Sequence, residues 1–229
     1  MSRRPLILAA FLALTAGAAD EPTGAEVAAV DHLVFAVADL DRGIELIERL
    51  TGVRAVIGGR HPGLGTWNAL ISLGPATYLE IIAPDPGQPD FSGTRPFGLD
   101  TLPGPRLVTW AARTSDIEAI AGIGAGPGVV MSGSRRRPDG ALLRWRFTDP
   151  AEVVENGVVP FFIDWGDSPH PAASAPPGAT LAGLSVEHPD PERIIGLFRR
   201  LGIDIPVIPA AEPALVAVLD TPAGRVELR

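Results

Sequence analysis

Residues 30–52 read VDHLVFAVADLDRGIELIERLTG and contain a strand followed by a helix. The segment from Val30 to Val37 is rich in β-branched residues, which is typical of a strand. Asp39 is a favourable N-cap for the next segment, where apolar residues recur at nearly the 3.6-residue helical period until Gly52. Three more strand-like runs follow at 54–57, 66–73 and 77–83. Residues 30–84 therefore predict one β-α-β-β-β unit.

The same order of elements returns near the C-terminus. Residues 181–203 read LAGLSVEHPDPERIIGLFRRLGI, with Asp190 and Gly202 in the positions of Asp39 and Gly52. A looser copy occupies the middle of the chain. Features that recur in the same order at similar spacing indicate an internal repeat. The expected units are 30–84, 106–166 and 180–229, which together predict an α+β fold class built from repeated β-α-β-β-β units.

Composition excludes several kinds of chemistry. The chain has 229 residues, no cysteine and a net charge of −8, and all 19 of its basic residues are arginine. Without cysteine there is no thiol nucleophile, disulfide or thiolate metal site, and without lysine there is no Schiff base. The negative charge argues against a nucleic-acid partner, because phosphate binding needs a basic face.

The first 19 residues differ from the rest. Two arginines at positions 3 and 4 precede an apolar run, and Ala16-Gly17-Ala18 supplies a small-x-small cleavage pattern. This layout predicts a secretory signal peptide at 1–19, since the apolar run is too short to span a membrane. The protein is then periplasmic or secreted and has no membrane anchor after cleavage. Both the general route and the twin-arginine route remain open.

The sequence resembles the vicinal oxygen chelate superfamily, in particular the bacterial glyoxalase-like domain proteins. The residues that carry the resemblance are VDHLV at 30–34, RHPGLGTWNAL at 60–70, YLEIIAP at 78–84 and FFIDWG at 161–166. The resemblance covers nearly the whole chain after residue 30. It implies a curled mixed sheet of the glyoxalase, bleomycin-resistance and extradiol dioxygenase type, in which paired units surround a metal ion.

The resemblance also implies metal ligands on the first and last strands of a unit, where this chain has His32 and Glu80. The third unit has Gly183 in place of His32, although Glu227 matches Glu80, so the usual set of four is incomplete. His170 is the candidate third ligand. Two histidines and a carboxylate suit a divalent ion such as Fe, Mn, Zn, Ni or Co.

Other residues are candidates for substrate contact or catalysis. Glu80 is either a metal ligand or a catalytic base, because a carboxylate within an apolar run is costly to bury without a partner. His61 is either a second catalytic residue or a surface histidine. Asn68 either orients a substrate carbonyl or ends a sheet edge, and Trp67 and Trp110 line a substrate pocket or fill the core.

Two functions follow from these residues. The first is an exported, divalent-metal-dependent enzyme that acts on a small oxygen-chelating substrate as a lyase, isomerase or dioxygenase. The alternative is a metal-free protein of the same fold that binds a small aromatic molecule. In both cases the expected partner is a small molecule, and a homodimer is left open. The Arg135-Arg136-Arg137 run precedes a Pro-Asp-Gly turn and predicts a solvated hairpin tip.

Overall fold

The computed structural model describes residues 28–123, 128–137, 139–149 and 154–229. The predicted signal peptide at 1–19 lies outside these residues. In the part of the chain that is described, no helix has the length and apolar character needed to cross a membrane.

The first predicted unit folds with the expected order of elements. Asp39 caps its helix by accepting a hydrogen bond from the backbone N–H of Arg42, and Gly52 ends the helix in the left-handed conformation with φ of 73°. The second strand is longer than the predicted 54–57, because Gly58 and Gly59 lie inside it. The elements are β1 (Val30–Ala36), α1 (Leu40–Thr51), β2 (Val56–His61), β3 (Thr66–Gly74) and β4 (Thr77–Pro84).

The middle unit has the same order with a shorter helix. Its helix is capped by Asp116, which accepts from the backbone N–H of Ala119. The strands and helix are β5 (Arg106–Arg113), α2 (Ile117–Ala121), β6 (Val130–Arg136), β7 (Leu142–Thr148) and β8 (Phe161–Asp164). Short 3₁₀ helices lie in the connections at η1 (Pro96–Thr101), η2 (Val154–Gly157) and η3 (Pro171–Ala173).

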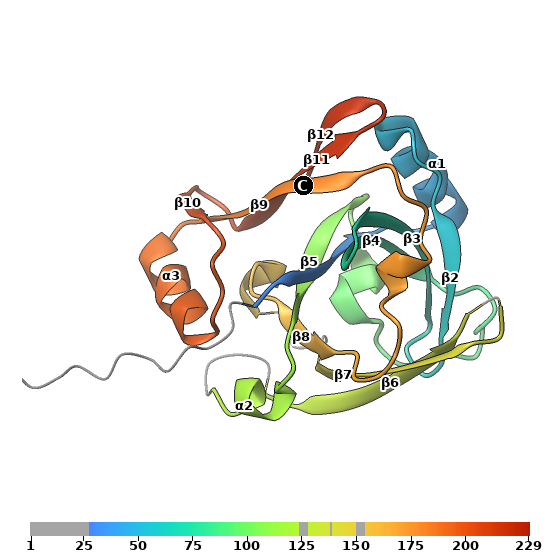
Figure 1. The fold of residues 1–229 in the computed structure, drawn as a ribbon, viewed down its shortest axis with the longest axis horizontal. Helices are drawn as coiled ribbons and strands as arrows, with labels where there is room; N and C mark the ends of the chain where they lie inside the picture. The colour runs from blue at the N-terminus through green and yellow to red at the C-terminus, as the bar shows by residue number, and fades with distance from the viewer. Residues whose placement is uncertain (1–27, 124–127, 138, 150–153) are drawn as a thin grey trace, which may run out of the picture.

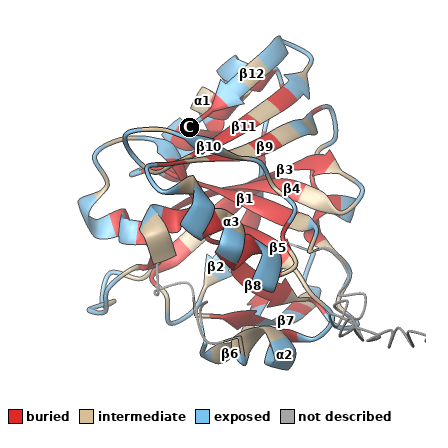
Figure 2. Cartoon of the chain, turned by 90° about the vertical axis from the view of Figure 1, so that its left-hand side faces the viewer, coloured by how far each residue is buried: buried red, intermediate tan, exposed pale blue. Residues whose placement is uncertain are grey.

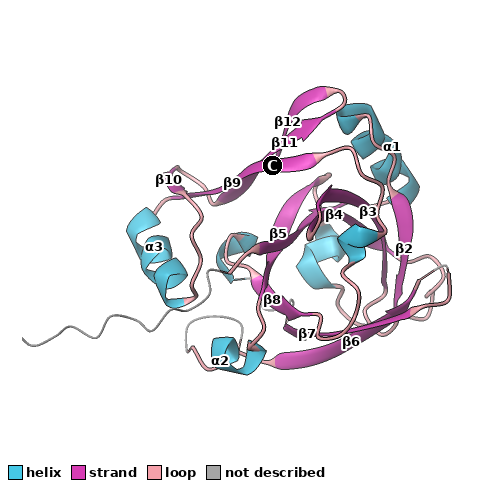
Figure 3. Cartoon of the chain, in the orientation of Figure 1, coloured by secondary structure: helices cyan, strands magenta, loops and turns pink. Residues whose placement is uncertain are grey.

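These two units form one eight-stranded sheet in the order β2-β3-β4-β1-β5-β8-β7-β6. Strand β1 is parallel to β4 and antiparallel to β5, so β1 and β5 join the two halves. The sheet curls into a nearly closed barrel, seen end-on in Figure 1 and Figure 3. The prediction of an α+β fold with a curled mixed sheet is therefore confirmed.

The two edges of this sheet meet where β2 approaches β6. A Cβ atom on Gly59 would lie 2.9 Å from the backbone oxygen of Arg136, and the φ of Gly59 is 149°. A Cβ on the neighbouring Gly58 would meet the side chains of Asn68 and Arg135. Glycine is required here because the backbones and side chains of the two halves come too close for a larger residue.

The C-terminal region forms a separate four-stranded sheet in the order β10-β9-β11-β12. Strand β9 pairs with β10 on one side and with β11 on the other. Strand β12 therefore cannot pair with β9 and pairs with β11. In the first unit, by contrast, the last strand pairs with the first. Glu227 and Gly183 are therefore not placed as Glu80 and His32 are. The elements are β9 (Thr180–His188), α3 (Pro191–Arg200), β10 (Val207–Pro209), β11 (Ala214–Thr221) and β12 (Gly224–Leu228).

Side chains alternate between two apolar cores. On β1, Leu33 and Phe35 point outward into a core shared with α1, β9, β11 and α3, whereas Val34 points into the barrel. Figure 2 shows the buried strands of the C-terminal sheet continuing those of the barrel. The outer core holds the C-terminal sheet in place, and the inner one surrounds the interior of the barrel, where the polar residues discussed next lie.

Candidate active site

A cavity lies inside the barrel, and side chains from both halves line it. Its volume is about 60 Å³. The cavity has room for several water molecules or one small organic molecule. The polar lining residues are His32, His61, Thr66, Asn68, Tyr78, Glu80 and Arg135. The sequence motifs at 30–34, 60–70 and 78–84 therefore meet at one place.

Glu80 on β4 is the centre of the polar group. Its Oε1 accepts a hydrogen bond from the side-chain nitrogen of Asn68 at 2.5 Å. His32 Nε2 lies 3.7 Å from Oε2, and His61 Nε2 lies 3.9 Å from Oε1. Strand alternation explains the meeting, because His32 and Glu80 both point inward from paired, parallel strands. A buried carboxylate thus faces two imidazoles and one amide.

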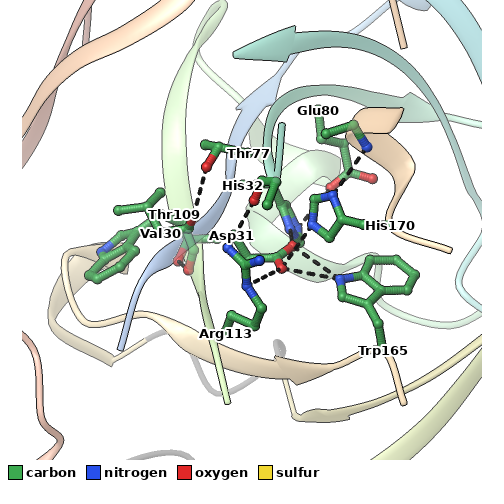
Figure 4. A network of polar contacts seen from close by, with 12 residues as sticks. Val30, Asp31, His32, Thr77, Glu80, Thr109, Arg113, Trp165 and His170 are labelled. Atoms are coloured by element: carbon green, nitrogen blue, oxygen red, sulfur yellow. Dashed lines mark hydrogen bonds and ion pairs between the residues drawn. The ribbon is translucent and has the colours of Figure 1, made fainter. Parts of the chain in front are cut away.

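Asp31, next to His32 in the chain, fixes the orientation of that imidazole. Its carboxylate lies 2.8 Å from His32 Nδ1, and Trp165 Nε1 and His170 Nε2 donate to it from the other side (Figure 4). A carboxylate only accepts, so His32 Nδ1 carries a proton and donates it to Asp31, which leaves Nε2 on the side of Glu80. Although burial raises the pKa of Asp31, the hydrogen bonds from His170 and His32 outweigh it and lower that pKa well below its usual range.

His61 lies at the end of β2, not in a loop. Its Nδ1 is 2.9 Å from Thr66 Oγ1, and its Nε2 is 3.4 Å from the side-chain nitrogen of Asn68. Burial lowers the pKa of His61, and the positive charge of Arg135 adds to the effect, while Glu80 opposes it. His61 is therefore neutral at physiological pH, with its Nε2 available to accept a proton.

The second half of the barrel contributes mainly apolar walls. Phe147 and Phe161 come from β7 and β8, and Trp145 packs on Trp165 with ring centroids 5.4 Å apart. Phe97 closes another side with a φ of 62°, an unfavourable conformation for an aromatic residue. Such a wall excludes water and strengthens the electrostatic interactions of the polar group.

Tyr78 and Arg135 also line the cavity, and the sequence alone did not single them out as site residues. Tyr78 stacks on His32 with centroids 4.5 Å apart, and burial raises its pKa well above the usual value. Arg135 is only 4% exposed, so the prediction that it belongs to a solvated hairpin tip is wrong. The available signal was strand alternation, which puts Arg135 inward and Arg136 outward.

Three of the predicted site residues lie elsewhere. Trp110 is fully buried in the outer core, where its Nε1 donates to the backbone oxygen of Val158. Trp67 packs against the same core and lies under the guanidinium of Arg60. His170 is held by Asp31 through Nε2, and its Nδ1 accepts from the backbone N–H of Ala172.

The predicted metal triad of His32, Glu80 and His170 is therefore not assembled, because both nitrogens of His170 already have partners. Across the described ranges, no three His, Asp or Glu side chains are placed to hold a metal ion together. His32 and His61 approach different oxygens of Glu80, and Asn68 donates to one of them. The donors surround a carboxylate and do not fit the divalent ion common in this superfamily.

Comparison with known proteins agrees with the fold and with these motifs. Residues 30–202 match the model of the glyoxalase-like domain, which is three quarters of the chain. The chain belongs to the glyoxalase-like domain family. It is thus a member of the vicinal oxygen chelate superfamily, as the sequence motifs predict. No curated protein matches the sequence.

Solved structures of low sequence identity are similar to this chain to different degrees. A hypothetical protein from Staphylococcus aureus aligns with a TM-score of 0.58 at 16% identity, covering 80% of this chain and 87% of that one. Methylmalonyl-CoA epimerase from Mycobacterium tuberculosis aligns with a TM-score of 0.43 at 24% identity, covering 63% and 93%. The Streptomyces coelicolor epimerase in complex with 2-nitronate-propionyl-CoA gives 0.43 at 20% identity, covering 64% and 100%.

Proposed function

We propose that this protein is an enzyme in which Glu80 transfers a proton to and from a small oxygen-bearing substrate in the barrel. The observation that carries the proposal is the placement of Glu80: a buried carboxylate in a largely apolar cavity, held by Asn68 and faced by His32 and His61. A base held in place in a dry site can remove a proton attached to carbon beside a carbonyl group.

In the reaction, Glu80 accepts the proton, and the electron pair of the broken C–H bond delocalises onto the substrate oxygen as an enolate. Return of the proton to the same or a neighbouring atom completes an isomerisation and regenerates the carboxylate. His61, neutral because its pKa is lowered, can relay the proton. The cation of Arg135, at the same cavity, stabilises the developing negative charge.

The experiment is deuterium incorporation in D₂O, followed by proton NMR over a panel of small carbonyl and carboxylate compounds. We expect the wild type to exchange the hydrogen beside the carbonyl of at least one compound, and Glu80→Gln to slow exchange by about 10²–10⁴-fold. Glu45→Gln, on the exposed face of α1, is the matched control and keeps the wild-type rate. Full exchange activity in Glu80→Gln would overturn the proposal.

Metal content provides a second test, because the described donors do not fit a divalent ion. We expect the protein purified without chelators to hold well under one ion per chain, and dialysis against chelator to leave proton exchange unchanged. One ion per chain, lost in both His32→Ala and Glu80→Ala, would instead support the metal-dependent reading of the motifs.

A metal-free binding protein is the second candidate, and the aromatic walls favour it. Trp145, Trp165, Phe147 and Phe161 surround a cavity suited to a small flat molecule. It predicts ligand binding, seen as a change in tryptophan fluorescence, with no exchange in D₂O for any bound compound. Exchange that depends on Glu80 contradicts it.

We also propose that residues 1–19 direct export to the periplasm or the medium. The support is the order of arginines, apolar run and small residues at the N-terminus. The mass of the protein recovered from a periplasmic fraction tests this: loss of the first 18 or 19 residues is expected, and an intact N-terminus in the cytosolic fraction contradicts it.

A further inference from the structure

Tyr78 is a buried phenol in the cavity that the proposed proton transfer does not use. It lies on β4 two residues before Glu80, so both side chains point to the same face of the strand, and both line the cavity. It is 3% exposed and is the single tyrosine of the chain. Strand β4 therefore brings a hydroxyl group and the base into the same enclosed space.

Two imidazoles hold the ring of Tyr78 in place. His32 stacks on it with centroids 4.5 Å apart, and His170 packs edge-on to it with centroids 5.6 Å apart. Both imidazoles are in turn bonded to the carboxylate of Asp31, at 2.8 Å and 3.1 Å. The network that orients His32 thus also fixes the position of the phenol. A donor fixed in advance costs little reorganisation when a reaction begins.

The hydroxyl group of Tyr78 keeps its proton at physiological pH. Burial raises the pKa of the phenol well above its usual value, and the negative charges of Asp31 and Glu80 add to the effect, while Arg135 opposes it. Tyr78 is thus within electrostatic range of both the base and the cation of the cavity. Among the described residues no group is hydrogen-bonded to this hydroxyl, so it can donate to a molecule in the cavity.

The spacing of Tyr78 and Glu80 matches the proposed reaction. Residues i and i+2 of a strand lie about 7 Å apart. In the substrate, the carbon that loses its hydrogen is bonded to the carbonyl carbon. With a contact of about 3 Å to the base at one end and a hydrogen bond of about 2.7 Å at the other, this unit spans a similar length. One molecule can therefore meet Glu80 through its carbon and Tyr78 through its oxygen.

We infer that Tyr78 is a catalytic residue whose hydroxyl donates a hydrogen bond to the substrate oxygen that becomes negative when Glu80 removes the proton. This deepens the proposed function and rests on it. The electron pair of the broken C–H bond moves to the carbonyl oxygen, Glu80 holds the proton taken from carbon, and Tyr78 keeps its own. The hydrogen bond strengthens as the oxygen becomes negative, so it lowers the barrier to proton removal.

The alternative role of Tyr78 is structural, as the ring against which His32 packs. Tyr78→Phe separates the two roles, because it keeps the ring and removes the hydroxyl group alone. A structural role predicts that Tyr78→Phe exchanges protons as the wild type does. A catalytic role predicts a lower rate in a protein of unchanged stability.

The experiment measures deuterium incorporation in D₂O by proton NMR, with the purified full chain and with acetone, hydroxyacetone and pyruvate as probes. We expect kcat to fall about 10- to 100-fold in Tyr78→Phe and KM to change by less than about threefold, since the hydrogen bond is strongest in the transition state. The urea midpoint should not change. A wild-type rate in Tyr78→Phe would overturn the inference.

Thr77→Val is the matched control, because it removes a hydroxyl group from the neighbouring residue of β4. That hydroxyl donates to the backbone oxygen of Val30 at 3.0 Å, and its side chain points to the opposite face of the strand. We expect Thr77→Val to have a lower urea midpoint and a wild-type exchange rate, the reverse of Tyr78→Phe. An equal fall in rate in both variants would overturn the inference.

A spectroscopic measurement detects the hydrogen bond itself. Tyrosine labelled with ¹³C at Cζ gives one resonance, because the chain has one tyrosine. Glu80→Gln is used here, since the probe that the wild type exchanges should bind to it without reacting. We expect that probe to move the Tyr78 resonance downfield, toward the position of an ionised phenol, in a saturable way. An unmoved resonance at concentrations that saturate the wild type contradicts the inference.

The exchange rate of Glu80→Gln separates this inference from the proposed function. Loss of exchange in both Glu80→Gln and Tyr78→Phe supports both. Loss in Glu80→Gln with a wild-type rate in Tyr78→Phe removes the role of Tyr78 and leaves the base in place. Full exchange in Glu80→Gln, or no exchange of any probe by the wild type, removes the proposed function and the role of Tyr78 with it.

Discussion

The two halves of the barrel share a topology but contribute different chemistry. The first half supplies His32, His61, Asn68 and Glu80, all groups that accept, donate or orient a proton. At the position across from Val34, the second half has Thr109 on β5, and its β8 carries Phe161 and Ile163 toward the cavity. One half has polar side chains at inward positions, and the other has mainly apolar ones.

In this superfamily paired units supply the metal ligands together. The asymmetry explains why this chain has candidate ligands, His32 and Glu80, in its first unit alone among the described residues of the barrel. A metal held by both halves needs inward donors on β5 or β8, and among the described residues those strands present mainly apolar side chains. The single cation of the second half that lines the cavity, Arg135, comes from β6 instead. The first half is therefore suited to proton transfer, and the second to shaping the cavity and fixing a charge.

The largest effect is expected from Asp31→Asn, which removes the carboxylate charge that orients the His32 imidazole in the first half of the barrel. Asp31 is buried and contacts His32, His170, Trp165 and Arg113. Breaking such a buried network costs about 3–5 kcal/mol of unfolding free energy, measured by urea denaturation at pH 7. Deuterium exchange should fall as well, because the amide no longer forces the proton onto His32 Nδ1.

The effect of Asp31→Asn should depend on pH in a defined direction. The folded-state pKa of Asp31 lies below the unfolded value of about 3.9, so its contribution to stability is present above pH 4 and is lost as pH falls toward the folded pKa. The gap in unfolding free energy between wild type and variant should therefore shrink from pH 7 to pH 3. A gap that is constant or grows at low pH would contradict this assignment.

The next effect concerns the seam where the two halves meet. Gly59→Val places a branched side chain against the backbone oxygen of Arg136 at a φ of 149°, and should cost about 2–3 kcal/mol of unfolding free energy. Gly74 has the same φ of 149° but open space around it, so Gly74→Val is the matched control and isolates the cost of backbone strain. Equal losses of unfolding free energy in both variants would show that the close approach of Gly59 to Arg136 adds nothing to the cost of backbone strain.

The sequence was sufficient to predict the helices and strands, but not to predict which segments far apart in the chain come into contact. The cap at Asp39 and the left-handed Gly52 are local features, and the first helix lies where they predict it. The positions of His32 and Glu80 follow from alternation along paired strands, so they too could be found. Their meeting with His61 and Asn68 depends on the strand register of β2, β3 and β4, which no local pattern in the sequence predicts.

Residues whose roles depend on closure of the barrel could not be found in this way. Arg135 is exposed or buried depending on whether β6 reaches β2, a contact between segments about 75 residues apart. His170 looked like a ligand because nothing local to it shows that Asp31, far away in the sequence, already holds its Nε2. Trp110 shows the same limit, since alternation alone does not say which face of β5 is the cavity.

A smaller effect is expected from the apolar wall of the second half. Phe161 lines the cavity and packs edge-on to His32, with centroids 5.5 Å apart. Phe161→Leu keeps an apolar wall while altering its shape, so we expect KM to rise about three- to tenfold with kcat nearly unchanged. The measurement is steady-state kinetics of the exchange reaction, and a large fall in kcat would show that the second half also takes part in the chemistry.

The smallest effect is expected from Glu227→Gln in the C-terminal region. Its sequence position matches Glu80, and a true third copy of the site would lose function on this change. Glu227 is exposed on β12, and among the described residues its ion-pair partner is Arg229 at the surface. Exposed ion pairs of this kind contribute little. We expect unfolding free energy to change by less than about 0.5 kcal/mol and exchange in D₂O to stay at the wild-type rate. Loss of activity in Glu227→Gln would mean that the C-terminal sheet contributes to the chemistry, even though β9 is paired with β10 and β11 and β12 does not pair with β9.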